Sequence, residues 1–191
     1  CEVSLPSLKY AVSAYYLISS AEAASNLSRF DGIKYGYRSS HDTDDFNELI
    51  KATRSEGFGD EVKRRILLGN YALCSGYYDA YYNNASRIRR QIVEEYNAIF
   101  AGCDVILTPT APTTAYKIGE QENDPVKMYL ADICTVTVNI AGLPAISTPC
   151  GYGADGMPIG MSLVGKSFDE AQIIAMCDAY ERSFDRKKAL L

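Results

Sequence analysis

The chain has 191 residues, of which 47% are hydrophobic and 23% charged, with a formal net charge of −5 and a pI near 5.0. This composition is typical of one globular domain, or of part of a larger one, and excludes an intrinsically disordered chain. The acidic balance argues against a broad basic surface for nucleic acid or for anionic membranes, and there is no run of about 18 apolar residues that would predict a membrane span.

The first half of the sequence predicts helices separated by polar segments. An apolar, alanine-rich stretch that begins near Pro6 is expected to form a buried helix, and a polar loop follows it over 29–45. The break at Gly57-Phe58-Gly59 precedes a further helix, for which Asp60 is the predicted N-cap. The expected helices are 6–28, 44/45–53, 60–75 and 77–101.

The second half mixes short strands with helices. A buried strand over 103–109 is stopped by Pro109, and Asp124-Pro125 is a favourable helix start. The expected elements are a strand at 103–109, a loop at 109–114, a helix at 125–140, strands at 145–150 and 158–165, and a helix at 169–184. This order indicates an α/β or α+β class, with too few strands for a self-sufficient sheet.

The six cysteines do not form a metal-binding pattern. No two of them are closer than 16 positions, and His41 is the single histidine. A zinc site is therefore not expected, and neither is a metal or cofactor bound by this chain. Nothing else in the sequence resembles a small secreted scaffold, so we expect reduced thiols and a cytoplasmic protein.

Arg65 is the first candidate binding residue. Its neighbours on one face of the predicted helix are the small residues Gly69, Ala72 and Gly76. Such a guanidinium has room to reach across a cavity and bind a carboxylate in a two-pronged manner. The alternative is a tight helix–helix contact with Arg65 at its rim. Arg64, four residues after Asp60, is expected to form an exposed ion pair with it.

Asp132 is the second candidate. In the predicted helix at 125–140 it shares a polar face with Thr135 and Asn139, while much of the rest of that helix is apolar. The polar face either lines a pocket, where the carboxylate would hold an ammonium group, or faces solvent.

Tyrosine is abundant, with 15 residues against no tryptophan. Tyr77, Tyr78, Tyr81 and Tyr82 are interpreted as amphipathic core, with each ring inside and its hydroxyl at the edge. Tyr15 or Tyr16, on the first helix, could present a hydroxyl to a pocket, and the pattern does not choose between them. A guanidinium, a carboxylate and a phenol together suit a pocket for a free zwitterionic amino acid.

Five longer stretches resemble a known family. They are EAASNLSRFDGIKYGY at Glu22–Tyr37, RSEGFGDEVKRRI at Arg54–Ile66, SGYYDAYY at Ser75–Tyr82, PTAPTT at Pro109–Thr114 and AGLPAISTPCG at Ala141–Gly151. The chain resembles the C-terminal part of the A subunits of bacterial aspartyl/glutamyl-tRNA amidotransferases, within the amidase signature family. The resemblance covers essentially all of the chain and implies an α/β fold with a mixed sheet flanked by helices, incomplete in this chain.

The resemblance implies a glutaminase subunit. In that family the A subunit hydrolyses glutamine, and the ammonia amidates tRNA-bound glutamate or aspartate in a B subunit that uses ATP and Mg²⁺, while a small C subunit clasps the two. Catalysis there depends on a nucleophilic serine, a second serine and a lysine. No residue of this chain matches those three, so residues 1–191 are expected to be the C-terminal part of a single amidase domain whose catalytic N-terminal part is missing.

What the resemblance does carry over is a substrate clamp. By the spacing of the matched motifs it falls on Tyr15, Arg65 and Asp132: Arg65 would bind the α-carboxylate of glutamine, Asp132 its α-ammonium group, and Tyr15 would help to close the pocket. A clamp without a nucleophile positions its substrate but cannot cleave it. The chain alone is therefore expected to be inactive.

Two other functions stay open at this point, a non-catalytic binding or assembly module and a different amidase-signature hydrolase. The expected partners are glutamine and the B and C subunits, with charged tRNA reached through the B subunit and no membrane. Direct tRNA binding is not expected, because Arg87, Arg89 and Arg90 are followed by Glu94 and Glu95. A truncated sheet with open edges favours self-association or packing against a neighbouring chain.

Overall fold

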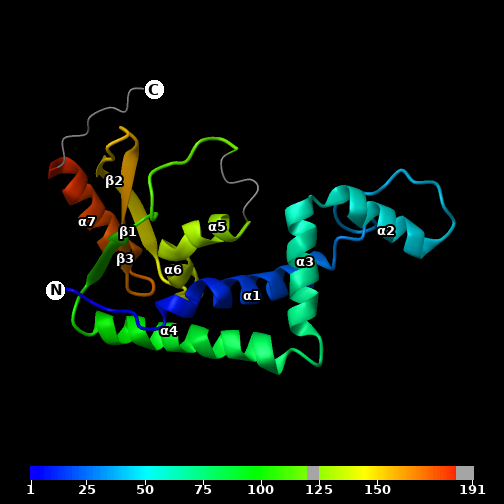
Figure 1. Ribbon diagram of the computed structural model, residues 1–191, viewed down its shortest axis with the longest axis horizontal. Coiled ribbons are helices and arrows are strands. Elements are labelled where there is room, and N and C mark those ends of the chain that lie inside the picture. Colours follow the sequence, from blue (N-terminus) through cyan, green and yellow to red (C-terminus); the bar gives the residue numbers. More distant parts are fainter. Residues whose placement is uncertain (120–124, 184–191) are drawn as a thin grey trace. The chain divides into compact units, whose positions relative to one another are not determined.

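The computed structural model describes residues 1–119 and 125–183, which divide into two compact units (Figure 1). Unit 1 comprises Cys1–Tyr15 with the chain from Ile88 onward, and unit 2 comprises Tyr16–Arg87. In the described ranges no helix is both long and apolar enough to cross a bilayer. All six cysteines lie in these ranges and carry free thiols.

The helices follow the predicted order, with two interruptions. They are α1 (Leu8–Leu27), α2 (Phe46–Gly57), α3 (Asp60–Leu73), the π-helical turn η1 (Asp79–Asn83), α4 (Asn84–Phe100), α5 (Pro125–Leu130), the 3₁₀ turn η2 (Ala131–Cys134), α6 (Val136–Ala141) and α7 (Glu170–Ser183). The predicted ends at Asp124 and Phe184 lie outside the described residues. The predicted start of α3 is corrected, because Gly59 is the N-cap and Asp60 is the first helical residue.

Unit 1 is built on an antiparallel sheet of β1 (Val105–Pro109), β2 (Ala145–Tyr152) and β3 (Pro158–Gly165) in the order β1-β3-β2. The α/β class is thereby confirmed, and all pairings among the described strands are antiparallel. The two strands predicted at 145–150 and 158–165 form the hairpin β2–β3, whose turn places Gly156 at a φ of +78°.

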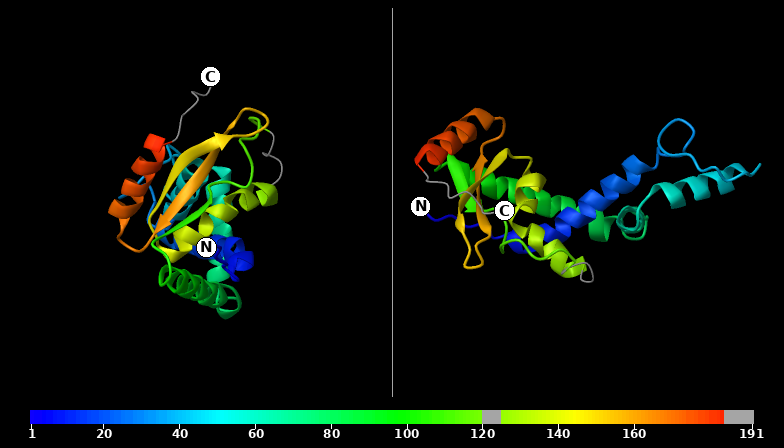
Figure 2. Two further views of the ribbon diagram at one scale, coloured as in Figure 1. Left: turned by 90° about the vertical axis from the view of Figure 1, so that its left-hand side faces the viewer. Right: turned by 90° about the horizontal axis from the view of Figure 1, so that it is seen from above.

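The sheet separates an apolar layer from a polar one. Since side chains alternate along a strand, Met161 and Leu163 share one face, where they pack with Cys177 of α7. Ser147 and Ser162 lie directly opposite each other in the ladder and occupy the other face, on the side of α6 (Figures 1 and 2). The hydroxyl-bearing face of the sheet is therefore the one that adjoins Cys134 and the helix after it.

Unit 2 contains most of α1, with α2, α3 and η1. Its α1 and α3 meet at Gly69, where a Cβ would overlap the backbone carbonyl of Ser20 and lie 2.7 Å from the Cβ of Ala24. Gly69 is buried and Ala72 is fully inaccessible to solvent. The small-residue face predicted around Arg65 is thus a tight helix–helix contact.

Candidate functional site

Asp132 lies in the 3₁₀ turn η2, at a break in the segment for which one continuous helix over 125–140 was predicted. That prediction is wrong, and the local sequence supplies the reason. The β-branched residue Thr135, which has a low helix propensity, stands at the junction between η2 and α6. The hydroxyl of Thr135 also donates to the carbonyl of Asp132 at 3.0 Å, in competition with the regular helical bond. Asp132 itself is half-buried.

The helix that follows Asp132 is fixed to α4. The hydroxyls of Thr137 and Tyr96 share a buried hydrogen bond of 2.9 Å, and Nε of Arg89 donates to the carbonyl of Ile140 at 3.1 Å. Burial raises the pKa of the Tyr96 phenol above its usual value near 10, because a phenolate would be poorly solvated there. Arg89 therefore caps a helix end and does not belong to a purely solvated basic face.

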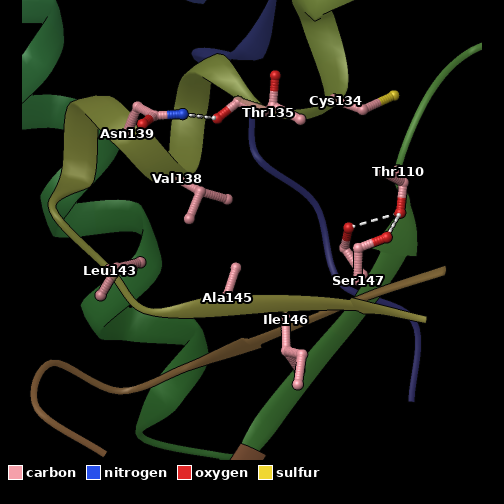
Figure 3. A pocket seen from close by; sticks show the side chains of 10 residues that line it. Thr110, Cys134, Thr135, Val138, Asn139, Leu143, Ala145, Ile146 and Ser147 are labelled. Atoms are coloured by element: carbon pink, nitrogen blue, oxygen red, sulfur yellow. Dashed lines mark hydrogen bonds between the residues drawn. The ribbon is translucent and has the colours of Figure 1, made fainter. Parts of the chain in front are cut away.

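A pocket of about 320 Å³ opens between α6 and the polar face of the sheet (Figure 3). Thr135 and Asn139 line it from the helix, so two of the three residues on the predicted polar face border a cavity. On the sheet side, Thr110 Oγ1 lies 2.9 Å from Ser147 Oγ and 2.8 Å from Ser162 Oγ. The full lining is Thr110, Cys134, Thr135, Val138, Asn139, Leu143, Ala145, Ile146, Ser147 and Ser162.

Among the described residues that line this pocket, none is charged and none is an activated nucleophile. Burial raises the pKa of the Cys134 thiol, which keeps the sulfur protonated and unreactive at neutral pH. The hydroxyl of Thr110 hydrogen-bonds to those of Ser147 and Ser162, and neither histidine nor lysine is part of this lining. The pocket can therefore hold a small, polar, neutral group but cannot by itself attack one.

Arg65 is held on α3 by two neighbours within unit 2. Its Nε donates to Oε1 of Glu61 at 3.1 Å, and its guanidinium carbon lies 5.6 Å from the centre of the Tyr16 ring. The side chain is half-buried. These contacts orient the guanidinium through a charge pair on one side and an aromatic face on the other.

The surface ion pairs around Arg65 differ from the predicted one. Arg64 pairs with Glu61, three residues earlier, and Asp60 pairs instead with Lys63 at 3.4 Å. The predicted Arg64–Asp60 pair is therefore wrong. Lys63 and Arg64 each pair with the carboxylate three residues earlier. Sequence reasoning missed Glu61 and Tyr16 as neighbours of Arg65, although the spacing of four between Glu61 and Arg65 was a usable signal.

The three predicted clamp residues are placed on different elements. Tyr15, on α1, and Asp132, on η2, belong to unit 1, and Arg65, on α3, belongs to unit 2. Tyr15 is half-buried. It is Tyr16, fully within unit 2, whose ring lies against the guanidinium of Arg65.

The tyrosines after α3 form a surface cluster and not the predicted core. The rings of Tyr71 and Tyr77 stack at 4.4 Å, and Tyr81 tilts against both. All three are exposed, as is Tyr78. Hydrogen bonds to Tyr77 and then Tyr81 contribute to raising the pKa of Tyr71 to about 12. Tyr81 lies in the π-helical turn η1, whose spacing of side chains a sequence period of 3.6 does not predict.

Among the residues that the structure describes, no three His, Cys, Asp or Glu side chains are grouped so that they could hold a metal ion.

The comparisons with known proteins agree on one family. The family model described as "Amidase" matches residues 1–174. The A subunit of the glutamyl-tRNA(Gln) amidotransferase of Brevibacillus brevis is 59% identical over 95% of this chain, and the protein of the same name from Bacillus cytotoxicus is 57% identical over all of it. The chain spans 37% and 39% of the length of these two relatives.

Solved structures show the same similarity. The crystal structure of the glutamyl-tRNA(Gln) amidotransferase A subunit from Thermotoga maritima matches 98% of this chain with a TM-score of 0.68 and 38% identity, and the chain covers 35% of it. A structure called "Crystal structure of amidase" matches 96% of the chain with a TM-score of 0.70 at 23% identity, and 37% of that structure is covered.

Proposed function

Because this chain belongs to the amidase family, we propose that it forms the glutamine-binding part of the glutaminase subunit of a tRNA-dependent amidotransferase. The observation that carries the proposal is the identity of 57–59%, over 95–100% of the chain, to relatives named as A subunits of glutamyl-tRNA(Gln) amidotransferases. The match to the second relative covers the whole chain and so includes the segments that bear Arg65 and Asp132. Because the chain spans under two fifths of these relatives, the activity belongs to the complete subunit.

In this proposal three residues of the chain grip the ends of free glutamine. The guanidinium of Arg65 binds the α-carboxylate, the carboxylate of Asp132 binds the α-ammonium group, and Tyr15 closes the pocket. The contacts of Arg65 with Glu61 and Tyr16 support this role, because a pre-oriented guanidinium loses less conformational entropy when it binds a carboxylate. Half-burial of Arg65 and Asp132 strengthens both charge interactions relative to bulk water.

The clamp contributes to catalysis by placement. Binding energy from the two charged ends of glutamine holds its side-chain amide against a nucleophile, which turns an encounter into an oriented reaction. We assign the nucleophilic serine, the second serine and the lysine to a part of the complete subunit that this chain does not match. Hydrolysis would then convert glutamine and water into glutamate and ammonia.

The proposal includes partners as well as chemistry. The names of the relatives describe one subunit of a larger enzyme, which supports an assembly with further subunits. We assign ATP, Mg²⁺ and the charged tRNA to a B subunit, with a small C subunit joining the two. The net charge of −5 supports indirect rather than direct contact of this chain with tRNA. The expected setting is the cytoplasm, where translation takes place.

A substrate panel tests the proposal. The complete A subunit, assembled with its partner subunits, should release ammonia from free glutamine far faster than from apolar primary amides of similar length. The 191-residue chain alone should release none. Preference for an apolar amide would instead identify a different amidase-signature hydrolase, and ammonia release by the isolated chain would overturn the proposed division between clamp and nucleophile.

A further inference from the structure

The side chains of Thr135 and Asn139 donate hydrogen bonds to the backbone beside Asp132, and the proposed clamp assigns no role to either of them. We propose that Thr135 and Asn139 are positioning residues that fix the Asp132 carboxylate for the α-ammonium group of a free amino acid. The inference rests on the proposed function, because it assumes the role assigned there to Asp132.

The two side chains form a relay of hydrogen bonds to the backbone. The carbonyl of Asp132 accepts from both the amide nitrogen and Oγ1 of Thr135, at 2.9 and 3.0 Å. The carbonyl of Thr135 in turn accepts from Nδ2 of Asn139 at 2.9 Å, a bond visible in Figure 3, while the backbone nitrogen of Asn139 stands at 3.3 Å. Asn139 is thus linked to Thr135, and Thr135 to the carbonyl of Asp132.

This relay stabilises a turn that is weak by itself. A 3₁₀ turn has poorer hydrogen-bond geometry than an α-helix and is used in short pieces. Its residues advance by about 120° instead of about 100°, so relaxation of η2 into an α-helix would rotate the side chain of Asp132, three residues before Thr135, by about 60°. The direction in which the side chain of Asp132 leaves the backbone therefore depends on what keeps η2 in its 3₁₀ form.

The other end of the relay is anchored. Thr137 is bonded to Tyr96 in the interior, and Arg89 holds the carbonyl of Ile140, so α6 is fixed to α4 on its buried side. The hydrogen bonds of Asn139 and Thr135 connect the backbone of Asp132 to this anchored helix. Both relay residues also border the pocket beside the sheet.

A back-bond from threonine to a helix carbonyl also occurs for purely local reasons, and the experiment must separate the two roles. The assay uses the complete A subunit with its partner subunits and compares glutamine with glutaramate, which keeps the amide and the carboxylate but lacks the α-ammonium group. Thr135→Val should raise KM for glutamine about three- to ten-fold, the effect of one lost hydrogen bond, with little change in kcat. The kcat/KM for glutaramate should stay unchanged.

Three further variants complete the test. Thr135→Ser, which keeps the hydroxyl, should restore the KM for glutamine. Asn139→Leu, at an exposed position where the fold tolerates change, should shift KM in the same direction by a smaller factor. Thr148→Val removes a buried hydroxyl, bonded to Glu181 at 2.8 Å on the other face of the sheet, and should lower stability without affecting KM.

Equal losses of kcat/KM for both substrates, or an unchanged KM in Thr135→Val and Asn139→Leu, would overturn the positioning role. Asp132→Asn separates this failure from that of the proposed function. If Asp132→Asn raises the KM for glutamine while the relay variants do not, the inference alone fails. If Asp132→Asn leaves that KM unchanged, the clamp fails and the inference falls with it.

Discussion

The regions around Asp132 and Arg65 solve the same problem, the fixing of a charged side chain, in opposite ways. Around Asp132 the side chains of Thr135 and Asn139 donate hydrogen bonds to backbone carbonyls, so they stabilise the conformation of η2, from which the carboxylate extends. Around Arg65 the backbone is an ordinary helix, and the contacts with Glu61 and Tyr16 go to the guanidinium itself. A short side chain with two χ angles is aimed through its backbone, whereas a long one must be held near its tip.

We therefore expect the two regions to be sensitive to different kinds of substitution. The Arg65 region should be sensitive to the packing of its helix, and the Asp132 region to the loss of single hydrogen bonds. The experiments below follow that contrast from the largest expected effect to the smallest.

The largest effect is expected for Gly69→Ala. Its Cβ would overlap the carbonyl of Ser20 on α1, and backbone atoms cannot move away as a flexible side chain can. We expect a loss of about 3 kcal/mol in the free energy of unfolding, measured by urea denaturation of the complete subunit. Gly76→Ala is the matched control, because a Cβ there meets nothing within 4 Å. Equal stability of the two variants would contradict the tight contact of α1 with α3.

The next effect is that of Arg65→Ala on substrate binding. Loss of a charge-assisted, two-pronged carboxylate contact should raise the KM for glutamine about 100-fold, with kcat much less affected. Arg65→Lys should recover only part of this loss, because an ammonium group cannot reproduce the planar fork. Steady-state ammonia release by the assembled enzyme measures both. A KM for Arg65→Ala within about two-fold of the original would remove Arg65 from the clamp.

A third experiment tests the anchor of the Asp132 region. Tyr96→Phe leaves the buried hydroxyl of Thr137 without its partner and should cost about 1.5 kcal/mol of stability. The double variant with Thr137→Val should lose less than the sum of the two single losses, since no orphaned hydroxyl remains. Purely additive losses, measured by denaturation at neutral pH, would show that the two hydroxyls are not coupled.

The same phenol predicts a pH dependence. Because its pKa is raised in the folded protein, the folded state keeps a proton that the unfolded chain releases above a pH of about 10. The stabilising contribution of Tyr96 is therefore complete below that pH and is lost as pH rises through the folded pKa. Wild-type protein should lose stability more steeply than Tyr96→Phe as the pH rises from about 10 to the folded pKa of this phenol, because over that range the unfolded chain releases a proton that the folded protein keeps. Over the same range, the stability of the wild type relative to Tyr96→Phe rises as the pH falls. The rise is complete at the pKa of the unfolded chain, about 10. Stability curves that stay parallel throughout would contradict the burial of this group.

The sequence predicted most elements of the fold because most follow one regular period. The Gly-containing turn between two strand-like stretches predicted β3 at 158–165 with the bounds observed, and Pro125 marked the start of α5. The period failed where a side chain competes with the backbone. The hydroxyl of Thr135 supports a 3₁₀ turn in the middle of the predicted helix, and the predicted helix at 77–101 begins with a π-helical turn in which Tyr81 is exposed.

The sequence singled out candidate site residues but not the contacts that support them. Arg65 and Asp132 stood out because a long cation above small residues and a carboxylate on an apolar helix are unusual, and their role in a clamp stays a prediction. Tyr16 could not be assigned to Arg65, since that contact joins two helices and no spacing along the chain reports it. The resemblance favoured Tyr15, and the structure adds Tyr16 as the ring beside the guanidinium.

The smallest effect is expected for Glu61→Gln, which tests whether the charge on Glu61 matters or only its hydrogen bond. The amide oxygen can still accept from Nε of Arg65, so the geometry is retained while the ion pair is lost. A half-exposed pair at a spacing of four contributes about 0.3–0.5 kcal/mol, which converts to a change of about two-fold in KM for glutamine. Asp60→Asn, at the exposed pair with Lys63, is the control and should leave KM unchanged. If Glu61→Gln raises KM about ten-fold or more, Arg65 is held by its charge interaction with Glu61 rather than by packing against Tyr16. That result would strengthen the contrast between Arg65, which is fixed at its guanidinium, and Asp132, which is fixed through its backbone.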